Sequence, residues 1–167
     1  PRARAIMVTT SESLANAVSD EVERQLKLLP RESIARPAIE NNSYIAVMDS
    51  VEDMFTVMNE VAPEHLEIQL PDPMGYMSLV QNAGSVFLGA YASEPLGDYV
   101  GGTNHVLPTS GTARFSSPLG VYDFVKRTSF TQFTKERLEE VATHITTLAR
   151  TEGLEAHARA IEVRFEK

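Results

Sequence analysis

The residues best suited to chemistry begin with a glycine-rich stretch near the middle of the chain. Residues 97–108 hold Asp98, Asn104 and His105 together with three glycines. Because the stretch has neither helical nor strand periodicity, it is predicted to be a loop. Its glycines would let the backbone approach a small ligand or a metal ion closely. A polar surface loop with a turn at Gly101–Gly102 would have the same composition, so both interpretations remain open.

A second candidate is the adjacent acid and imidazole of Glu64 and His65, directly after Pro63. Such a pair can divide the work of acid–base catalysis: one group activates a water molecule while the other transfers a proton near neutral pH. A solvated junction between two elements would also accommodate Glu and His. The pair alone is therefore a weak signal.

The other metal-ligand types are more scattered. Asp98 and His105 could both bind Zn²⁺, but their spacing matches no helical or zinc-finger pattern. An Asp in a turn and a His bonded to backbone would explain them equally well. Glu152 and His157 flank Gly153, and Glu152 could simply favour a helix dipole. His144, between Val141 and Ile145, is interpreted as a surface or packing residue.

The elements that must position these residues alternate in type along the first half of the chain. Strands are predicted at residues 5–9, 44–48, 66–70 and 85–88, and helices at 11–29, 51–62 and 74–82. Residues 32–39 are predicted to form a short helix that Pro37 interrupts. Ser50 and Asp53 resemble a capping box. This alternation predicts an α/β fold with a largely parallel, layered sheet.

The second half differs, because it contains no further strand pattern. Residues 90–120 are predicted to be an ordered, functional loop region. Helical segments follow at residues 121–127, 132–150 and 154–165. We therefore predict an α/β domain portion at residues 1–120 with a catalytic loop at 90–120, and a C-terminal helical lobe or arm at 121–167.

Composition excludes several classes of protein. The net charge of −8 argues against a protein that binds nucleic acid or an anionic membrane surface. The chain has no cysteine, which excludes disulfides and thiolate catalysis. No apolar run approaches the ~20 residues of a membrane span. No Gly-x-Gly-x-x-Gly follows a strand, so the ordinary dinucleotide-binding motif is absent. The N-terminal Pro-Arg-Ala-Arg, without an initiator Met, suggests a piece of a longer protein.

Several stretches occur together in a particular order. These are Pro-Glu-His-Leu at 63–66, Ala-Gly-Ser-Val-Phe-Leu-Gly at 83–89, Ser-Glu-Pro-Leu-Gly-Asp-Tyr at 93–99, Gly-Thr-Asn-His-Val-Leu-Pro-Thr at 102–109, and Glu152 with His157. In this combination the chain resembles histidinol dehydrogenase. The resemblance covers essentially the whole chain but only the C-terminal two-fifths or so of the family's length, so the expected fold is an incomplete Rossmann-like domain followed by the helical arm.

The resemblance implies a zinc-dependent homodimer that oxidises L-histidinol to L-histidine with two NAD, the last steps of histidine biosynthesis. Glu64 and His65 match the acid–base pair, and Asp98 and His157 match zinc ligands, with His157 supplied by the partner's C-terminal arm. His105 and Glu152 match substrate-contacting positions, and the substrate-binding set implied in this way is Glu64, His65, Asp98, His105, Glu152 and His157. A cytoplasmic location is implied, or a plastid if the source is a plant.

The departures from the family pattern concern what lies upstream. The family's Gln and His zinc ligands, at Gln-x-x-His spacing, would precede Pro1, as would most of the NAD-binding machinery. The isolated chain is therefore expected to be inactive, and an upstream portion supplied as a second chain would be a partner. Two alternatives remain: a non-catalytic fragment or dimerisation module, and a paralogous NAD-dependent dehydrogenase of another small polar alcohol.

Overall fold

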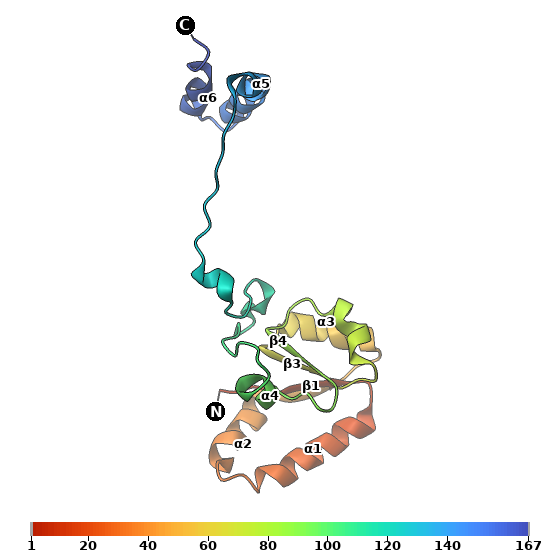
Figure 1. The fold of residues 1–167 in the computed structure, drawn as a ribbon. Coiled ribbons are helices and arrows are strands. Elements are labelled where there is room, and N and C mark those ends of the chain that lie inside the picture. The colour runs from red at the N-terminus through yellow and green to blue at the C-terminus, as the bar shows by residue number, and fades with distance from the viewer. Residues whose placement is uncertain (1, 167) are drawn as a thin grey trace. The chain divides into compact units, whose positions relative to one another are not determined.

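The computed structural model describes residues 2–166 and divides by internal contacts into two compact units, Pro1–Phe124 and Val125–Lys167. The first unit contains four strands with helices between them, and the second contains two helices, α5 and α6 (Figure 1). None of the helices in residues 2–166 combines the length and the apolar content needed to cross a bilayer.

The strands of the first unit form two parallel pairs. In one pair β1 (Ile6–Thr9) lies beside β2 (Tyr44–Val47), and in the other β3 (His65–Ile68) lies beside β4 (Ser85–Leu88). The register of the second pair places His65 opposite Ser85. Parallel pairing requires crossover connections, and helices or helical turns provide them here. The predicted α/β class with parallel strands is confirmed.

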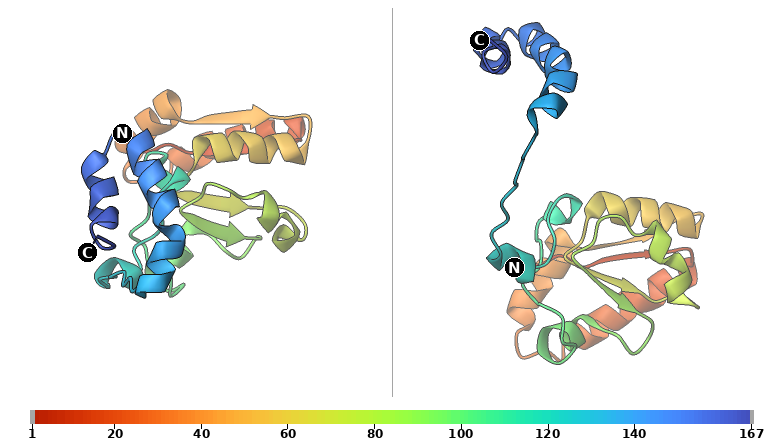
Figure 2. Two further views of the ribbon diagram at one scale, coloured as in Figure 1. Left: turned by 90° about the horizontal axis from the view of Figure 1, so that it is seen from above. Right: turned by 45° about the horizontal axis from the view of Figure 1, so that its top comes forward.

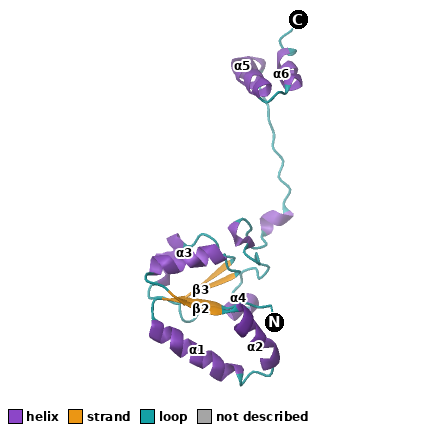
Figure 3. Ribbon diagram, turned by 180° about the vertical axis from the view of Figure 1, so that it is seen from behind, coloured by secondary structure: helices purple, strands orange, loops and turns teal. Residues whose placement is uncertain are grey.

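Helices lie on both sides of the strands. α1 (Glu12–Leu26) and α2 (Glu32–Asn42) connect β1 to β2. α3 (Val51–Val61) leads from β2 to β3 and lies on the other side of the strands from α1, as Figure 3 and the right-hand view of Figure 2 show.

Side-chain caps explain where two of these helices begin. The Ser11 hydroxyl accepts a hydrogen bond from the Leu14 amide, and Ser50 accepts one from the Asp53 amide. Each satisfies a donor that the first helical turn leaves unpaired. Ala62 then ends α3 in the left-handed conformation, with φ 49°. Pro63, Glu64 and β3 follow directly, so the end of α3 determines where His65 enters the sheet.

The core of the first unit lies between α3 and the β3–β4 pair. Phe55, Leu66 and Ile68 are buried together, and the Phe55 ring stacks on Tyr76 with centroids 5.8 Å apart. Leu66 and Ile68 alternate with His65 and Glu67 along β3. Because successive strand side chains point to opposite faces, burying the two aliphatic residues turns His65 and Glu67 to the other face.

Four predicted elements differ from the structure. Pro37 lies inside α2 without ending it, and the guanidinium of the neighbouring Arg36 forms ion pairs with Glu32 and Glu40 of the same helix. The helix expected at 74–82 is a 3₁₀ helix, η1, over Pro73–Leu79. The stretch 90–120, expected to be a loop, contains α4 (Glu94–Tyr99) and a short 3₁₀ turn, η2, at Thr112–Arg114. The helical segment expected at 121–127 is a 3₁₀ turn, η3 (Val121–Phe124), at the end of the first unit.

The second unit is a helical hairpin. α5 (Lys135–Thr151) and α6 (Glu155–Glu162) pack against each other around a turn at Gly153, whose φ of +75° favours glycine. Arg150 ties the hairpin together, with Nη2 at 2.8 Å from Glu155 Oε1 and Nη1 at 2.9 Å from Glu162 Oε1. This unit carries Glu152 and His157.

Candidate functional site

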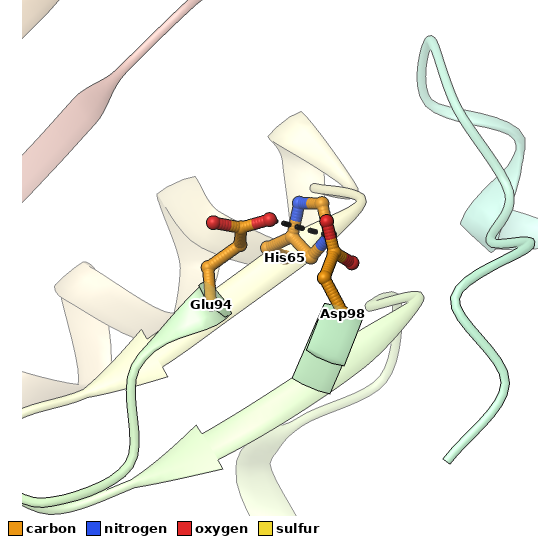
Figure 4. Close-up of side chains that lie close together, drawn as sticks. All are labelled: His65, Glu94 and Asp98. Atoms are coloured by element: carbon orange, nitrogen blue, oxygen red, sulfur yellow. Dashed lines mark ion pairs between the residues drawn. The ribbon is translucent and has the colours of Figure 1, made fainter. Parts of the chain in front are cut away.

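Three potential ligand side chains converge at one end of the β3–β4 pair. His65, Glu94 and Asp98 each offer an atom that lies within 4.8 Å of the others (Figure 4). His65 Nε2 lies 3.9 Å from Glu94 Oε1. His65 and Glu94 are half-buried and Asp98 is exposed. The site is thus partly packed where His65 and Glu94 lie and open to solvent where Asp98 lies.

The strand β3 presents the imidazole to this site. His65 is the first residue of β3, and its ring lies 6.1 Å from the ring of Phe87 on β4. Phe87 is only 7% exposed, so the side of His65 that faces it rests on a packed surface. The imidazole nitrogens remain accessible to polar groups on α4.

The short helix α4 presents the two carboxyl groups. Glu94 and Asp98 are four residues apart, so they lie on the same helical face. The Glu94 amide donates to Glu67 Oε1 at 3.0 Å, and the Glu67 carboxylate thereby supplies the cap that the Ser93 side chain does not. Since Glu67 and His65 share a face of β3, this bond ties the start of α4 to the strand that carries the imidazole.

Gly97 allows α4 to lie directly on the sheet. A Cβ atom at this position would stand 2.8 Å from the Cε1 and Cζ atoms of the Phe87 ring, closer than carbon atoms can approach. The glycine is therefore required by close packing. This contact between α4 and the Phe87 ring fixes how far Glu94 and Asp98 lie from His65.

Electrostatics at the site follow from two neighbouring carboxyl groups. Burial raises the pKa of the Glu94 carboxyl, and a hydrogen bond with Asp98 and its charge, together with the charge of Glu67, raise it further, while the charge of His65 lowers it. Carboxyl groups this close favour a shared proton or a bound cation. One imidazole and two carboxylates are also ligand types that Zn²⁺ accepts.

Glu64 is held by its backbone at the entrance to β3. Its carbonyl accepts a hydrogen bond from the Ser85 amide at 2.9 Å. A Cβ atom on Gly84 would stand 2.6 Å from that carbonyl oxygen and 3.1 Å from Pro108 Cδ. The end of the 97–108 stretch therefore packs beside Glu64. The Glu64 side chain itself is half-exposed.

His105 lies on the exposed part of that stretch. Asn104 Oδ1 accepts a hydrogen bond from the Val106 amide at 2.7 Å, which forms a local turn around His105. The group of converging ligands found within residues 2–166 does not include His105. The structure thus brings together His65 and Asp98 of the predicted residues, with Glu64 next in the chain.

Glu152 and His157 belong to the second unit, where both are exposed. Glu152 follows α5 as its C-terminal cap residue, and its amide donates to the Leu148 carbonyl at 3.0 Å. His157 lies in the first turn of α6, and its amide donates to the Leu154 carbonyl at 3.0 Å. His144 is exposed on α5.

Glu94 is the member of the cluster that sequence reasoning missed. The signal was its i, i+4 spacing from Asp98, but this spacing has meaning only in a helix. Pro95 and Gly97 made residues 94–99 look like a loop. Pro95 is acceptable in the first turn of a helix, and Gly97 is required by Phe87, so neither breaks α4.

The comparisons with known proteins agree with one another. The family model described as histidinol dehydrogenase matches residues 1–165. The histidinol dehydrogenases of Lactiplantibacillus plantarum and Streptococcus mutans are 67% and 60% identical to this chain over 165 residues, which is 99% of the chain and 39% of each relative. The chain thus spans about two-fifths of the length of the curated relatives it matches.

A solved structure gives the same result. The crystal structure of histidinol dehydrogenase from Elizabethkingia anophelis matches with a TM-score of 0.82 and 38% sequence identity, covering 97% of this chain and 37% of that one. The match of the family model over nearly every residue and the identity to relatives lead to one conclusion: this chain belongs to the histidinol dehydrogenase family.

Proposed function

We propose that the chain is the C-terminal portion of an NAD- and zinc-dependent oxidoreductase that converts L-histidinol to L-histidine in the cytoplasm, or in a plastid if the source is a plant. The observation that carries the proposal is the convergence of His65 and Asp98, which come from β3 and α4 in a chain of this family. The family resemblance assigns acid–base chemistry to the first and zinc ligation to the second.

The donor set fits a zinc ion. Asp98 offers an exposed carboxylate beside a second carboxyl group and an imidazole, and the accumulated negative charge favours a cation. We propose Asp98 and His157 as the two zinc ligands of this chain, with the other ligands contributed from outside it. When bound, the zinc ion would act as a Lewis acid that orients the substrate.

The remaining steps belong to residues of the chain. Histidinol is a cation, and Asp98, Glu94 and Glu152 supply negative charge that suits it. His65 would accept the hydroxyl proton as hydride leaves the carbinol carbon. Glu64 would then take a proton from the water that adds to the aldehyde, before the second oxidation. NAD is the proposed hydride acceptor, and no residue of this chain is assigned to it.

A chimera tests this proposal. The chain would replace the homologous part of the Lactiplantibacillus plantarum enzyme, to which it is 67% identical. We expect the purified chimera to form NADH with L-histidinol, and the 167-residue chain alone to form none. A chimera that folds but oxidises only other small alcohols, including anionic ones, would favour a paralogous dehydrogenase. A folded chimera without any dehydrogenase activity would favour a non-catalytic module.

Subunit mixing tests the proposed homodimer with exchanged arms. Two inactive chimeras, His65→Ala and His157→Ala, would be mixed and allowed to exchange subunits. If His157 serves the partner's site, each mixed dimer has one intact site, and about a quarter of the wild-type activity should return. If His157 serves its own subunit, the mixture stays inactive.

A further inference from the structure

The structure places a third side chain at the site, and the family resemblance gives it no role. Glu94 Oε1 lies 3.9 Å from His65 Nε2, and its carboxyl group also bonds that of Asp98 (Figure 4). Its side chain is 37% exposed and that of His65 is 27% exposed. The carboxyl group therefore lies close to both proposed functional residues and remains reachable from solvent.

Glu94 is itself held firmly. Its amide is bonded to Glu67 on β3, and the helix that carries it rests on the Phe87 ring through Gly97. The His65 ring faces the same Phe87 ring. Glu94 and His65 thus share two supports, the strand β3 and the Phe87 ring. This is the arrangement expected for a group that orients a neighbouring imidazole.

We propose that Glu94 is a positioning residue that orients the imidazole of His65 for proton transfer. Its carboxylate accepts a hydrogen bond from the Nε2–H group of His65, which leaves Nδ1 to receive the substrate hydroxyl proton. The 3.9 Å separation shortens to hydrogen-bonding distance when the site is filled, as catalytic contacts commonly do. This inference rests on the proposed function, because it needs His65 to act as the base.

The alternative is that Glu94 merely stabilises α4 or supports Asp98. These roles predict different results. Loss of α4 would lower thermal stability, and loss of support for Asp98 would lower zinc content and raise KM. Loss of orientation of His65 would lower kcat while zinc content and KM remain nearly unchanged.

The test uses Glu94→Ala and Glu94→Asp in the chimera, with Glu52→Ala as the matched control, since Glu52 is an exposed acidic residue in the first turn of α3. For Glu94→Ala we expect kcat to fall about 10–100-fold, with zinc content retained. Glu94→Asp should recover part of the loss. Added formate, which can enter the space left by the side chain, should restore activity to Glu94→Ala, whereas an equal concentration of chloride should not.

The outcomes distinguish failure of the proposed function from failure of the positioning role of Glu94. An unmodified chimera without histidinol oxidation would remove the proposed function itself. An active chimera in which Glu94→Ala keeps kcat within about threefold of the parent would overturn the positioning role. So would a loss that neither Glu94→Asp nor formate reverses, or one accompanied by loss of zinc. Partial recovery by both treatments, with zinc present, would support it.

Discussion

At the scale of single residues, the neighbours Glu64 and His65 carry different proposed tasks in two successive oxidations. His65 starts β3 beside α4, whereas the Glu64 carbonyl is fixed against Ser85 on the neighbouring strand. Glu64 lies in a bend directly before β3, and His65 is the first residue of the strand itself. The two side chains thus leave different local structures, and we assign the alcohol to His65 and the attacking water to Glu64.

This division predicts a split between half-reactions in the chimera. Glu64→Gln should slow oxidation of the aldehyde to histidine by about 10²–10⁴-fold, because the water loses its base. Oxidation of the alcohol should be affected much less. His65→Asn should show the larger loss with the alcohol as substrate. Rates measured separately with alcohol and aldehyde would decide the point, and equal losses for both substrates in both variants would refute the division.

Gly97 determines how closely α4 approaches the β3–β4 pair. Replacing it by Ala would push α4 away from Phe87, because the new methyl group would lie 2.8 Å from two ring carbons. We expect destabilisation of about 1–3 kcal/mol and a lower kcat/KM, since Glu94 and Asp98 move together. Gly120→Ala is the matched control, because its nearest neighbours are 3.8 Å away or more. Unchanged melting temperature and activity in Gly97→Ala would show that α4 does not rest on Phe87.

At the scale of elements, sequence patterns worked where local chemistry decides the structure. The strand at 85–88 was predicted at its observed bounds, and the Ser50 cap was located because capping needs only neighbouring residues. α4 could not be predicted, because it rests on Phe87 and is capped by Glu67, and both residues lie outside the segment itself. The site shows the same limit. His65 and Asp98 could be predicted from motifs, but Glu94 could be assigned to the site only once α4 was known to be a helix.

The stability of the helical hairpin formed by α5 and α6 is expected to depend on pH. Hydrogen bonds from Arg150 lower the pKa of Glu155 and of Glu162 below the ordinary value of 4.5. Carboxyl groups with a lowered pKa in the folded state stabilise it fully above about pH 4.5, and this contribution is lost as the pH falls through the lowered values.

Arg150→Gln should therefore reduce the loss of helical stability as the pH falls below about 4.5. The groups are exposed, so salt should also weaken the effect. Helical circular dichroism during thermal unfolding, measured at several pH values for parent and variant, tests this. Lys135→Gln is a control at the far end of α5. Identical pH profiles for the parent and Arg150→Gln would contradict the role of the ion pairs.

At the scale of the whole molecule, the chain exposes much apolar surface for its size. Large side chains with at least three-quarters of their area exposed gather between residues 91 and 130: Tyr91, Tyr99, Val100, Phe115, Val121, Tyr122, Phe124 and Phe130. Large apolar side chains that are exposed in this number are available for contact with other protein. They agree with a site that is completed by residues from outside this chain.

The most direct measurement of the central claim is zinc content per chain in the purified chimera. We expect about one zinc ion per chain, with loss of most of it in both Asp98→Ala and His157→Ala. The matched controls Asp20→Ala and His144→Ala, both at exposed helical positions, should retain it. If Asp98→Ala and His157→Ala keep the same zinc content and affinity as their controls, neither residue is a ligand, and the proposed zinc site is wrong.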